Sequence, residues 1–325
     1  MFSWKDIEKP IVALSPMADM TDSEFCLIAK RFGARIVFRE MVSSEALVRA
    51  NDKTLAMCAF EEAERPIIQQ IFGADPAVMA EAARIVEEKF RPDGIDINMG
   101  CPVYKITSNF NGAALMKDAK LASEIIRRMK AVLDVPLSVK IRLGWSDPRE
   151  CLEFAPALEQ AGADLLTVHG RTKAQGYSGV ADWKMVGEVK KRVSIPVLVN
   201  GDIHSPEAAV PAMQASGADG ALIARGALGN PWILKQIEEI LKDGKVSTRI
   251  DHETRIRTVI DHTKLMIGRW GEERGVTLMR KHYAWYFKGG PGSKETRQRL
   301  NRASALSEVE TILAESGAMT EAAAQ

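Results

Sequence analysis

Residues 196–226, PVLVNGDIHSPEAAVPAMQASGADGALIARG, contain in one run the pattern that decides the fold. An apolar segment ends at Asn200, Ser205 and Pro206 are typical of a helix start, and a second apolar segment runs from Gly220 to Ala224. Two strand-length apolar segments joined by a helix are typical of a parallel βαβ unit.

The same unit recurs from residue 11 onward. Strands are predicted at Ile11–Ser15, Arg35–Phe38, Pro66–Phe72, Gly94–Asn98, Pro136–Arg142, Asp164–His169, Pro196–Asn200 and Gly220–Ala224. Helical periodicity lies between them, at Pro76–Phe90, Asp118–Leu133, Pro148–Ala161, Asp182–Val193 and Ser205–Ala215. An open doubly wound sheet shows similar alternation, but eight successive units favour a closed (β/α)8 TIM barrel of the α/β class.

The pattern changes near residue 245. The polar segment KDGKVST (242–248) is followed, from Asp251, by helical periodicity without a strand candidate. We therefore predict a barrel domain over residues 1–245 and a small all-helical domain over residues 246–325. A length of 325 residues fits, because such barrels commonly take about 250 residues.

Composition excludes several classes of protein. Hydrophobic residues make up 46% of the chain and charged residues 27%, close to the average for soluble globular proteins, which excludes a disordered chain. There is no apolar run of membrane-spanning length and no signal-peptide pattern, so we expect a cytoplasmic protein without membrane contact. The four cysteines are far apart, so free thiols and no bound metal are expected. A monomer is the default expectation.

The net charge of +1 is unevenly distributed. Residues 255–302 hold 12 basic and 4 acidic side chains, a net charge of +8, which leaves −7 for the rest of the chain. Tyr283, Trp285 and Tyr286 lie among these basic residues. They suit a surface that binds phosphates and stacks on bases, and they suit equally the core of a small domain. The basic segment predicts a nucleic-acid partner.

Polar side chains lie at or near the ends of most predicted strands. In a β/α barrel the C-terminal ends of the strands form the active-site face. An unpartnered buried polar group costs about 1–3 kcal/mol, so a ring of such groups predicts a bound polar ligand. The ring consists of Ser15, Gln70, Asn98, Lys140, Arg142, His169, Asn200 and Arg225.

The chemistry of this ligand is partly readable. Glycine-containing turns after the seventh and eighth strands predict a phosphate site, to which Arg225 and His169 contribute. Lys140 is suited to stabilise an anion, to form a Schiff base or to pair with a carboxylate, and the residues leave these alternatives open. Cys101 lies in a loop between Gly100 and Pro102, where a thiol can act as nucleophile or proton donor.

Motifs in this order and spacing resemble those of the tRNA-dihydrouridine synthases, most closely the bacterial synthase B subgroup. They are PMADMTD (16–22), DINMGCPVYKI (96–106), SVKIRLGW (138–145), LTVHGRT (166–172), PVLVNGDI (196–203), ARGALGNPW (224–232) and RKHYAWYFKGGPGSKETRQRLNRA (280–303). The resemblance covers about residues 10 to 305.

The resemblance implies an FMN-containing barrel and a tRNA-binding helical domain, which together reduce the C5–C6 double bond of uridine in tRNA to dihydrouridine. Electrons would come from NADPH through FMN, and Cys101 would protonate C5 after hydride reaches C6. Asn98 and Arg171 would contact the uracil or the flavin edge. By matching position, FMN would be held by Pro16, Met17, Ala18, Gln70, Lys140, His169, Asn200, Gly201, Asp202, Ala224 and Arg225.

The sequence departs from the family pattern at three places. Asp19 and Ala224 stand where the family usually has glycine, and the loop Ser108–Gly112 is less basic than the common version. Two alternative functions stay open. An FMN enzyme acting on a small molecule would have no use for the basic helical domain, and a tRNA-binding protein without catalysis would have no use for Cys101 and Lys140.

Overall fold

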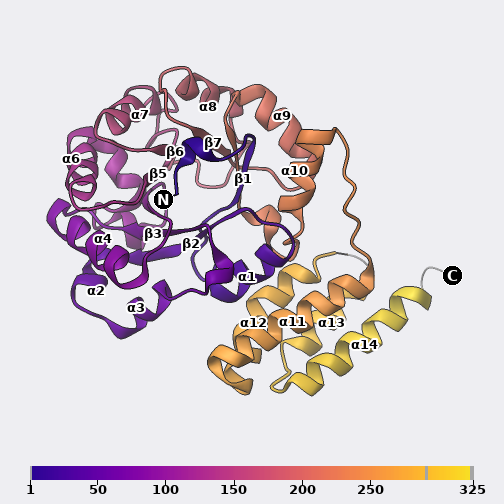
Figure 1. The fold of residues 1–325 in the computed structure, drawn as a ribbon. Helices are drawn as coiled ribbons and strands as arrows, with labels where there is room; N and C mark the ends of the chain where they lie inside the picture. Colours follow the sequence, from indigo (N-terminus) through magenta and orange to yellow (C-terminus); the bar gives the residue numbers. More distant parts are fainter. Residues whose placement is uncertain (1, 290–291, 323–325) are drawn as a thin grey trace.

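The computed structural model describes residues 2–289 and 292–322, the last six of these by their backbone alone. Eight parallel strands close into a barrel in the order β1 to β8, which confirms the predicted TIM barrel (Figure 1). The strands are β1 Ile11–Leu14, β2 Ile36–Ser43, β3 Ile67–Phe72, β4 Gly94–Met99, β5 Leu137–Arg142, β6 Leu165–His169, β7 Val197–Asn200 and β8 Gly220–Ile223.

Strand β2 differs most from its prediction. It is predicted over Arg35–Phe38, yet it continues to Ser43 with an irregular register between Arg39 and Val42. Arg39 is buried, and its guanidinium pairs with the buried carboxylate of Glu64 at 3.1 Å. A charge satisfied in this way does not end a strand.

Helices cover the outside of the barrel. They are α1 Ser23–Arg31, α2 Ser44–Val48, α3 Asp52–Cys58, α4 Pro76–Phe90, α5 Tyr104–Thr107, α6 Ala119–Lys130, α7 Cys151–Gln160, α8 Trp183–Lys190, α9 Pro206–Ser216 and α10 Ile233–Asp243. The expected start signals cap them: Asp75 accepts the N–H groups of Ala77 and Val78 at the start of α4, and Ser205 accepts that of Ala208 in α9. The predicted helices are therefore present, with ends shifted by a few residues.

Two apolar layers stabilise the barrel. One lies between the strands and the surrounding helices. The other fills the barrel interior at its N-terminal end, where Trp4 stacks on Phe38 with 6.0 Å between ring centroids. Ile68, Leu198 and Leu222 complete this interior layer from three different strands. The N-terminal end of the barrel is therefore closed by side chains, and a ligand must enter from the other end.

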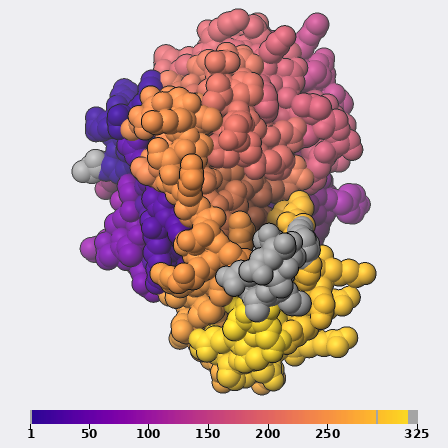
Figure 2. All heavy atoms as spheres, turned by 90° about the vertical axis from the view of Figure 1, so that its right-hand side faces the viewer, coloured from indigo at the N-terminus to yellow at the C-terminus, as the bar shows by residue number. Residues whose placement is uncertain are grey.

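The C-terminal helices form a second lobe with its own core (Figures 1 and 2). They are α11 His252–Trp270, α12 Glu272–Tyr286, α13 Ser293–Leu300 and α14 Leu306–Ala322, and the predicted boundary at residue 245 falls between α10 and α11. Tyr283 and Tyr286 are buried in this core, which decides between their two predicted roles. Within the described residues, no helix is long and apolar enough to span a membrane.

Candidate functional site

A cavity of about 690 Å³ opens at the C-terminal ends of the strands. Pockets that bind small molecules commonly have volumes of about 300–1,000 Å³. Of the predicted site residues, Arg171 alone is absent from its walls; those that line it are Pro16, Met17, Ala18, Gln70, Asn98, Cys101, Lys140, His169, Asn200, Gly201, Asp202, Ala224 and Arg225. The fold therefore brings together side chains from seven strand ends, as expected for a barrel active site.

Lys140 lies on the cavity wall, next to Asn98 in the register of β4 and β5. Its ammonium forms no hydrogen bond or ion pair among the residues that the structure describes. Burial, with a contribution from Arg142, lowers its pKa to about 8, although Asp96 and Cys101 act in the opposite direction. A half-buried cation that has no counter-ion among the described residues is suited to a ligand that is negatively charged where it meets the lysine.

Cys101 is the one partly exposed cysteine in the chain, whereas the other three are buried. Its backbone is held on both sides: its N–H donates to Asn98 Oδ1 at 2.9 Å, and its carbonyl accepts the N–H of Ala113 at 3.1 Å. Gly112 has φ +60° and lies so close that a Cβ there would come within 2.9 Å of the Cys101 carbonyl oxygen. The backbone that carries the thiol therefore has a fixed position at the cavity wall.

The turns after β7 and β8 form the side of the cavity that is predicted to hold phosphate. Gly201 has φ +114°, and a side chain there would collide with His169. The Arg225 side chain is 41% exposed and lies over the Tyr177 ring, with 4.9 Å from Cζ to the centroid. Its guanidinium lies 3.8 Å from Asp202 Oδ1, a long ion pair that leaves the side chain exposed enough to meet an anion as well.

His169 is buried at the end of β6. Burial and the nearby cations, Lys140 first among them, keep the pKa of His169 well below its usual range. The imidazole is therefore neutral near neutral pH and can offer a hydrogen bond but no charge to a ligand.

Arg171 and Asp202 bind each other. The Arg171 guanidinium donates to both carboxylate oxygens of Asp202, at 2.9 and 2.6 Å, and to the backbone carbonyls of Ser178 and Gly179. Asp202 also accepts the N–H of Ala181 at 2.8 Å. This ion pair ties the loop after β6 to the turn after β7. The predicted ligand contacts of the two residues stay predictions.

The structure gives a backbone reason for one departure from the family pattern and shows no obstacle at another. Asp19 has φ +61°, a conformation in which glycine is favoured and aspartate is among the better-tolerated alternatives, and its N–H donates to Glu40 Oε2 at 2.8 Å. Ala224 has φ −101° and ψ −110°, so its φ is negative although the pair of angles lies outside the main α and β regions. The substitution at residue 224 therefore does not require a left-handed backbone.

Three functional candidates escaped the prediction. Tyr177 lines the cavity and is 60% exposed, and Tyr104, at the start of the short helix α5, is 81% exposed. Asp96 lies below the cavity and is fully buried. The sequence contains signals for all three residues. The two tyrosines lie in segments that follow strand ends, and Asp96 precedes Asn98 by two residues, so Asp96 and Asn98 face the same side of β4.

The cavity residues fit a flavin mononucleotide. Gln70 and Asn98 supply amide groups beside Lys140, which is a donor set suited to the pyrimidine edge of a flavin and to its negative charge after reduction. Arg225 and the turn at Gly201 supply a guanidinium and a close approach of the backbone on the phosphate side.

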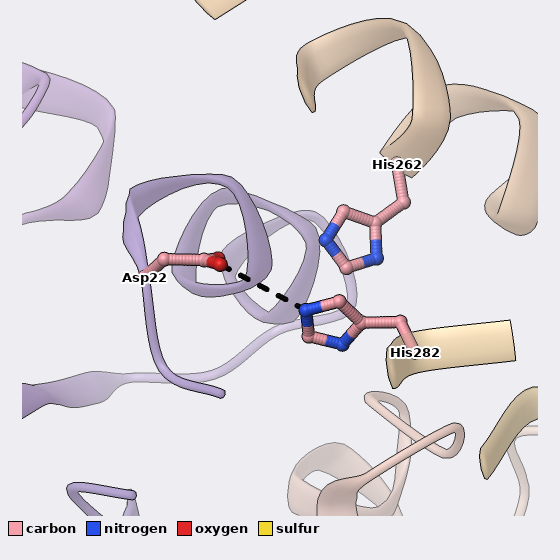
Figure 3. Close-up of side chains that lie close together, drawn as sticks. All are labelled: Asp22, His262 and His282. Carbon is pink, nitrogen blue, oxygen red and sulfur yellow. Dashed lines mark ion pairs between the residues drawn. The ribbon is translucent and has the colours of Figure 1, made fainter. Parts of the chain in front are cut away.

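A buried cluster of Asp22, His262 and His282 joins the barrel to the helical lobe (Figure 3). Asp22 caps α1 by accepting the N–H of Phe25 at 3.0 Å. Its other oxygen, Oδ2, lies 3.2 Å from the Lys281 ammonium and 3.8 Å from His282 Nε2. Burial keeps the pKa of both histidines below the usual value, so they are neutral near neutral pH.

The three side chains of this cluster point toward one another, and their potential metal-ligand atoms lie within 4.8 Å of one another (Figure 3). Ligand atoms that each lie about 2.1 Å from a tetrahedral zinc ion are roughly 3.4 Å apart. The limit of 4.8 Å in this cluster is wider than that separation. The Lys281 ammonium also neutralises the carboxylate that a cation would need. We therefore interpret the cluster as a polar junction between the two lobes.

Comparison with known proteins shows one consistent family. The family model described as "Dihydrouridine synthase (Dus)" matches residues 12–323. The chain is 41% identical to tRNA-dihydrouridine synthase B of Pseudomonas syringae over 89% of its length and 86% of that protein. It is 38% identical to a probable tRNA-dihydrouridine synthase of Rickettsia bellii, over 89% of each chain.

Solved structures show the same barrel at low identity. The crystal structure of TcOYE with pHBA has a TM-score of 0.54 at 11% identity and covers 75% of this chain and 92% of that one. A variant of NCR from Zymomonas mobilis has a TM-score of 0.53 at 16% identity and covers 78% of this chain and 96% of that one. At such identities the likeness concerns the fold.

Proposed function

The chain belongs to the dihydrouridine synthase family, and we propose that it reduces the C5–C6 double bond of specific uridines in tRNA to dihydrouridine, with FMN as bound cofactor and NADPH as electron donor. The observation that carries this proposal is the position of Cys101, a partly exposed thiol on the wall of the cavity that Lys140 and Asn98 also line. FMN, when bound, supplies the hydride that it has received from NADPH.

The residues of the chain provide orientation, charge and a proton. Lys140 places a positive charge against the flavin ring, and Gln70 and Asn98 offer amide groups beside it. Cys101 then acts as the general acid: its S–H bond breaks as a C–H bond forms at C5 of the uracil, while C6 receives the hydride. The backbone contacts on both sides of Cys101 hold the residue at the cavity wall, where its thiol would face the base.

A uracil reaches this depth only after it has left its stack in the tRNA. Exposed Tyr104 and Tyr177 carry aromatic rings near the mouth of the cavity, and such rings stack on extruded bases. Tyr283 and Tyr286 cannot take this role because they are buried in the core of the helical lobe. Trp285, the third aromatic residue predicted for this role, is half-buried and packs against the barrel core. We assign the aromatic contacts to RNA to the barrel loops.

The positive charge of the helical lobe is only partly free to bind RNA. Lys281 and Arg269 pair with Asp22 and Glu24 of the barrel, and Arg299 pairs with Glu315. The exposed basic residues without an ion pair in the described part of the chain include Lys288, Lys294 and Arg302. We assign tRNA phosphate contacts to this second group.

This assignment predicts the salt dependence of tRNA binding. Wild-type affinity falls steeply as salt rises, and Lys294→Ala or Arg302→Ala each lowers the slope of log K against log salt by about 1. Arg299→Ala, which removes an arginine already paired, leaves the slope closer to the wild-type value. Filter binding at several salt concentrations measures this. An affinity that does not change with salt contradicts the assignment.

The function itself is tested with the purified flavin-loaded protein and tRNA that lacks dihydrouridine. NADPH bleaches the flavin absorbance, tRNA restores it, and mass spectrometry finds uridines that have gained two hydrogens. Reoxidation by a free pyrimidine, but not by tRNA, indicates instead an enzyme for a small molecule. Tight tRNA binding without any flavin reoxidation indicates a binding protein without catalysis.

A further inference from the structure

Asp96 is a buried carboxylate that the proposed mechanism does not use. It has no exposed surface, does not line the cavity and lies on β4 below Asn98 and Lys140. Burial raises its pKa to about 6, although hydrogen bonds from Gln70 and Ser138 act in the opposite direction. It is therefore mostly ionised at neutral pH, and a charge kept at this depth needs a reason.

A continuous chain of hydrogen bonds connects this carboxylate to Cys101. Gln70 Nε2 donates to Asp96 Oδ2 at 2.6 Å, and Asn98 Nδ2 donates to Gln70 Oε1 at 2.8 Å. Asn98 Oδ1 then accepts the N–H of Cys101 at 2.9 Å and that of Gly100 at 3.2 Å. The other oxygen of Asp96 accepts the hydroxyl of Ser138 at 2.6 Å, outside this path.

The direction of the chain is determined at both ends. An ionised carboxylate only accepts, so Gln70 must turn its NH₂ group toward Asp96 and its oxygen toward Asn98. A backbone N–H only donates, so Asn98 must turn its oxygen toward Cys101 and its NH₂ group toward Gln70. The two requirements agree, and they fix the orientation of two amides that line the cavity.

We propose that Asp96 is a positioning residue that acts through Gln70 and Asn98 to hold the backbone of Cys101, and with it the thiol, in the geometry for proton transfer to the substrate. Without an acceptor at Asp96, the Gln70 amide is free to turn over. It would then present NH₂ to the NH₂ of Asn98 and break the link to Cys101. The inference rests on the proposed role of Cys101 as proton donor.

The first test compares Asp96→Leu with Asp96→Asn. Leucine has a similar shape but removes the acceptor. Asparagine keeps it, because its oxygen can face Gln70 while its NH₂ donates to the Ser138 hydroxyl. In single-turnover experiments, we expect Asp96→Leu to slow flavin reoxidation by tRNA about 100-fold, the cost of a misplacement of about 1 Å. Asp96→Asn should restore most of this rate.

Two further measurements separate positioning from other effects. Flavin reduction by NADPH precedes proton transfer, so it should differ little between Asp96→Leu and Asp96→Asn, which both lack the negative charge. Ser138→Ala removes the hydrogen bond outside the path and should leave flavin reoxidation by tRNA near its wild-type rate. Equal slowing in Asp96→Asn and Asp96→Leu, or slowing in Ser138→Ala as large as in Asp96→Leu, would overturn the proposal.

The second test needs neither flavin turnover nor tRNA. Iodoacetamide reacts with exposed thiols, and Cys101 is the one cysteine that is not buried. We expect Cys101 to be alkylated faster in Asp96→Leu than in wild type or Asp96→Asn, with the three buried cysteines still protected. The proposal is overturned if Cys101 is alkylated at the wild-type rate in Asp96→Leu. If the leucine variant does not fold, the smaller Asp96→Ala takes its place in this comparison. Loss of protection at all four cysteines shows general loosening and also counts against it.

These two tests separate the failure of the inference from that of the proposed function. If wild-type protein never passes electrons to tRNA, the proposed function fails, while the alkylation rates still show whether Asp96 holds Cys101. If tRNA reoxidises the flavin equally in all variants, the proposed function stands and the role of Asp96 fails.

Discussion

The two ends of the barrel interior are formed by the same strands but by opposite kinds of side chain. On β3, Ile68 belongs to the apolar layer at the N-terminal end, and Gln70, two residues later, lines the cavity. On β7, Leu198 and Asn200 show the same change. Residues two positions apart in a strand face the same side. A shift of two residues along the strand therefore leads from the apolar layer to the wall of the cavity.

This difference shows where stability and chemistry are supplied. At the N-terminal end, Trp4 and its neighbours bury apolar surface, and the Trp4 indole N–H is buried without a hydrogen-bond partner among the described residues. At the C-terminal end, Lys140 is held without a counter-ion, and its lowered pKa reports an unfavourable environment for its charge. Substitutions at the two ends should therefore affect different measurements.

The largest effect is expected at the C-terminal end, from Cys101→Ala. Removal of a general acid commonly costs about 100- to 10,000-fold in rate, so flavin reoxidation by tRNA should slow by this factor. The alanine leaves the NADPH step and the flavin content nearly unchanged, as stopped-flow absorbance would show. The matched variant Cys58→Ala, at a buried cysteine far along the chain, should keep wild-type reoxidation. Full activity in Cys101→Ala would remove the proton-donor role.

Trp4→Ala probes the opposite end. Truncation of a large buried aromatic residue commonly costs about 3–5 kcal/mol, so the free energy of unfolding should fall by this amount. The cavity lies at the other end of the barrel, so the folded variant should still bind flavin and turn over tRNA at moderate temperature. Urea unfolding followed by circular dichroism measures the first effect. A variant that unfolds like wild type but has lost its flavin would contradict the separation of the two ends.

A smaller effect concerns the charge of Lys140. Burial lowers its pKa to about 8 in the folded protein, whereas an unfolded lysine has a pKa of about 10.4. Between these values the unfolded chain binds a proton that the folded one lacks, so stability of the flavin-free protein rises with pH by at most about 1.4 kcal/mol per unit. Lys140→Met should lack this rise. Parallel stability curves of the two proteins from pH 8 to about 10 would contradict the lowered pKa.

Local pattern was sufficient for much of the architecture. The alternation of apolar runs with capped helices predicts all eight strands, and polar residues at strand ends predict the walls of the cavity. The prediction was wrong for the end of β2, because the charge of Arg39 is neutralised by Glu64, which is 25 residues away in the sequence. A pattern of neighbouring residues cannot predict an ion pair between residues so far apart in the sequence.

The site could be predicted as a set of residues but not as a set of contacts. Arg171 was expected at the ligand, and the structure shows its guanidinium bound to Asp202, 31 residues along the chain. In the polar junction between the lobes, Asp22 binds Lys281, which lies 259 positions later in the chain. No rule of sequence spacing connects these two residues. Asp22 and Lys281 lie in two of the motifs on which the family resemblance rests, but the resemblance does not show that they are in contact.

The sequence by itself determined the barrel class, the basic helical segment and the list of polar groups at the strand ends, because periodicity and composition are local properties. The tertiary structure alone decided which of these groups meet. It buried Tyr283 and Tyr286, left Lys140 without a partner among the described residues, and aligned Asp96, Gln70 and Asn98 into one chain that ends at Cys101. The physical reason is that strand register sets hydrogen-bond partners, and register follows from closure of the whole barrel.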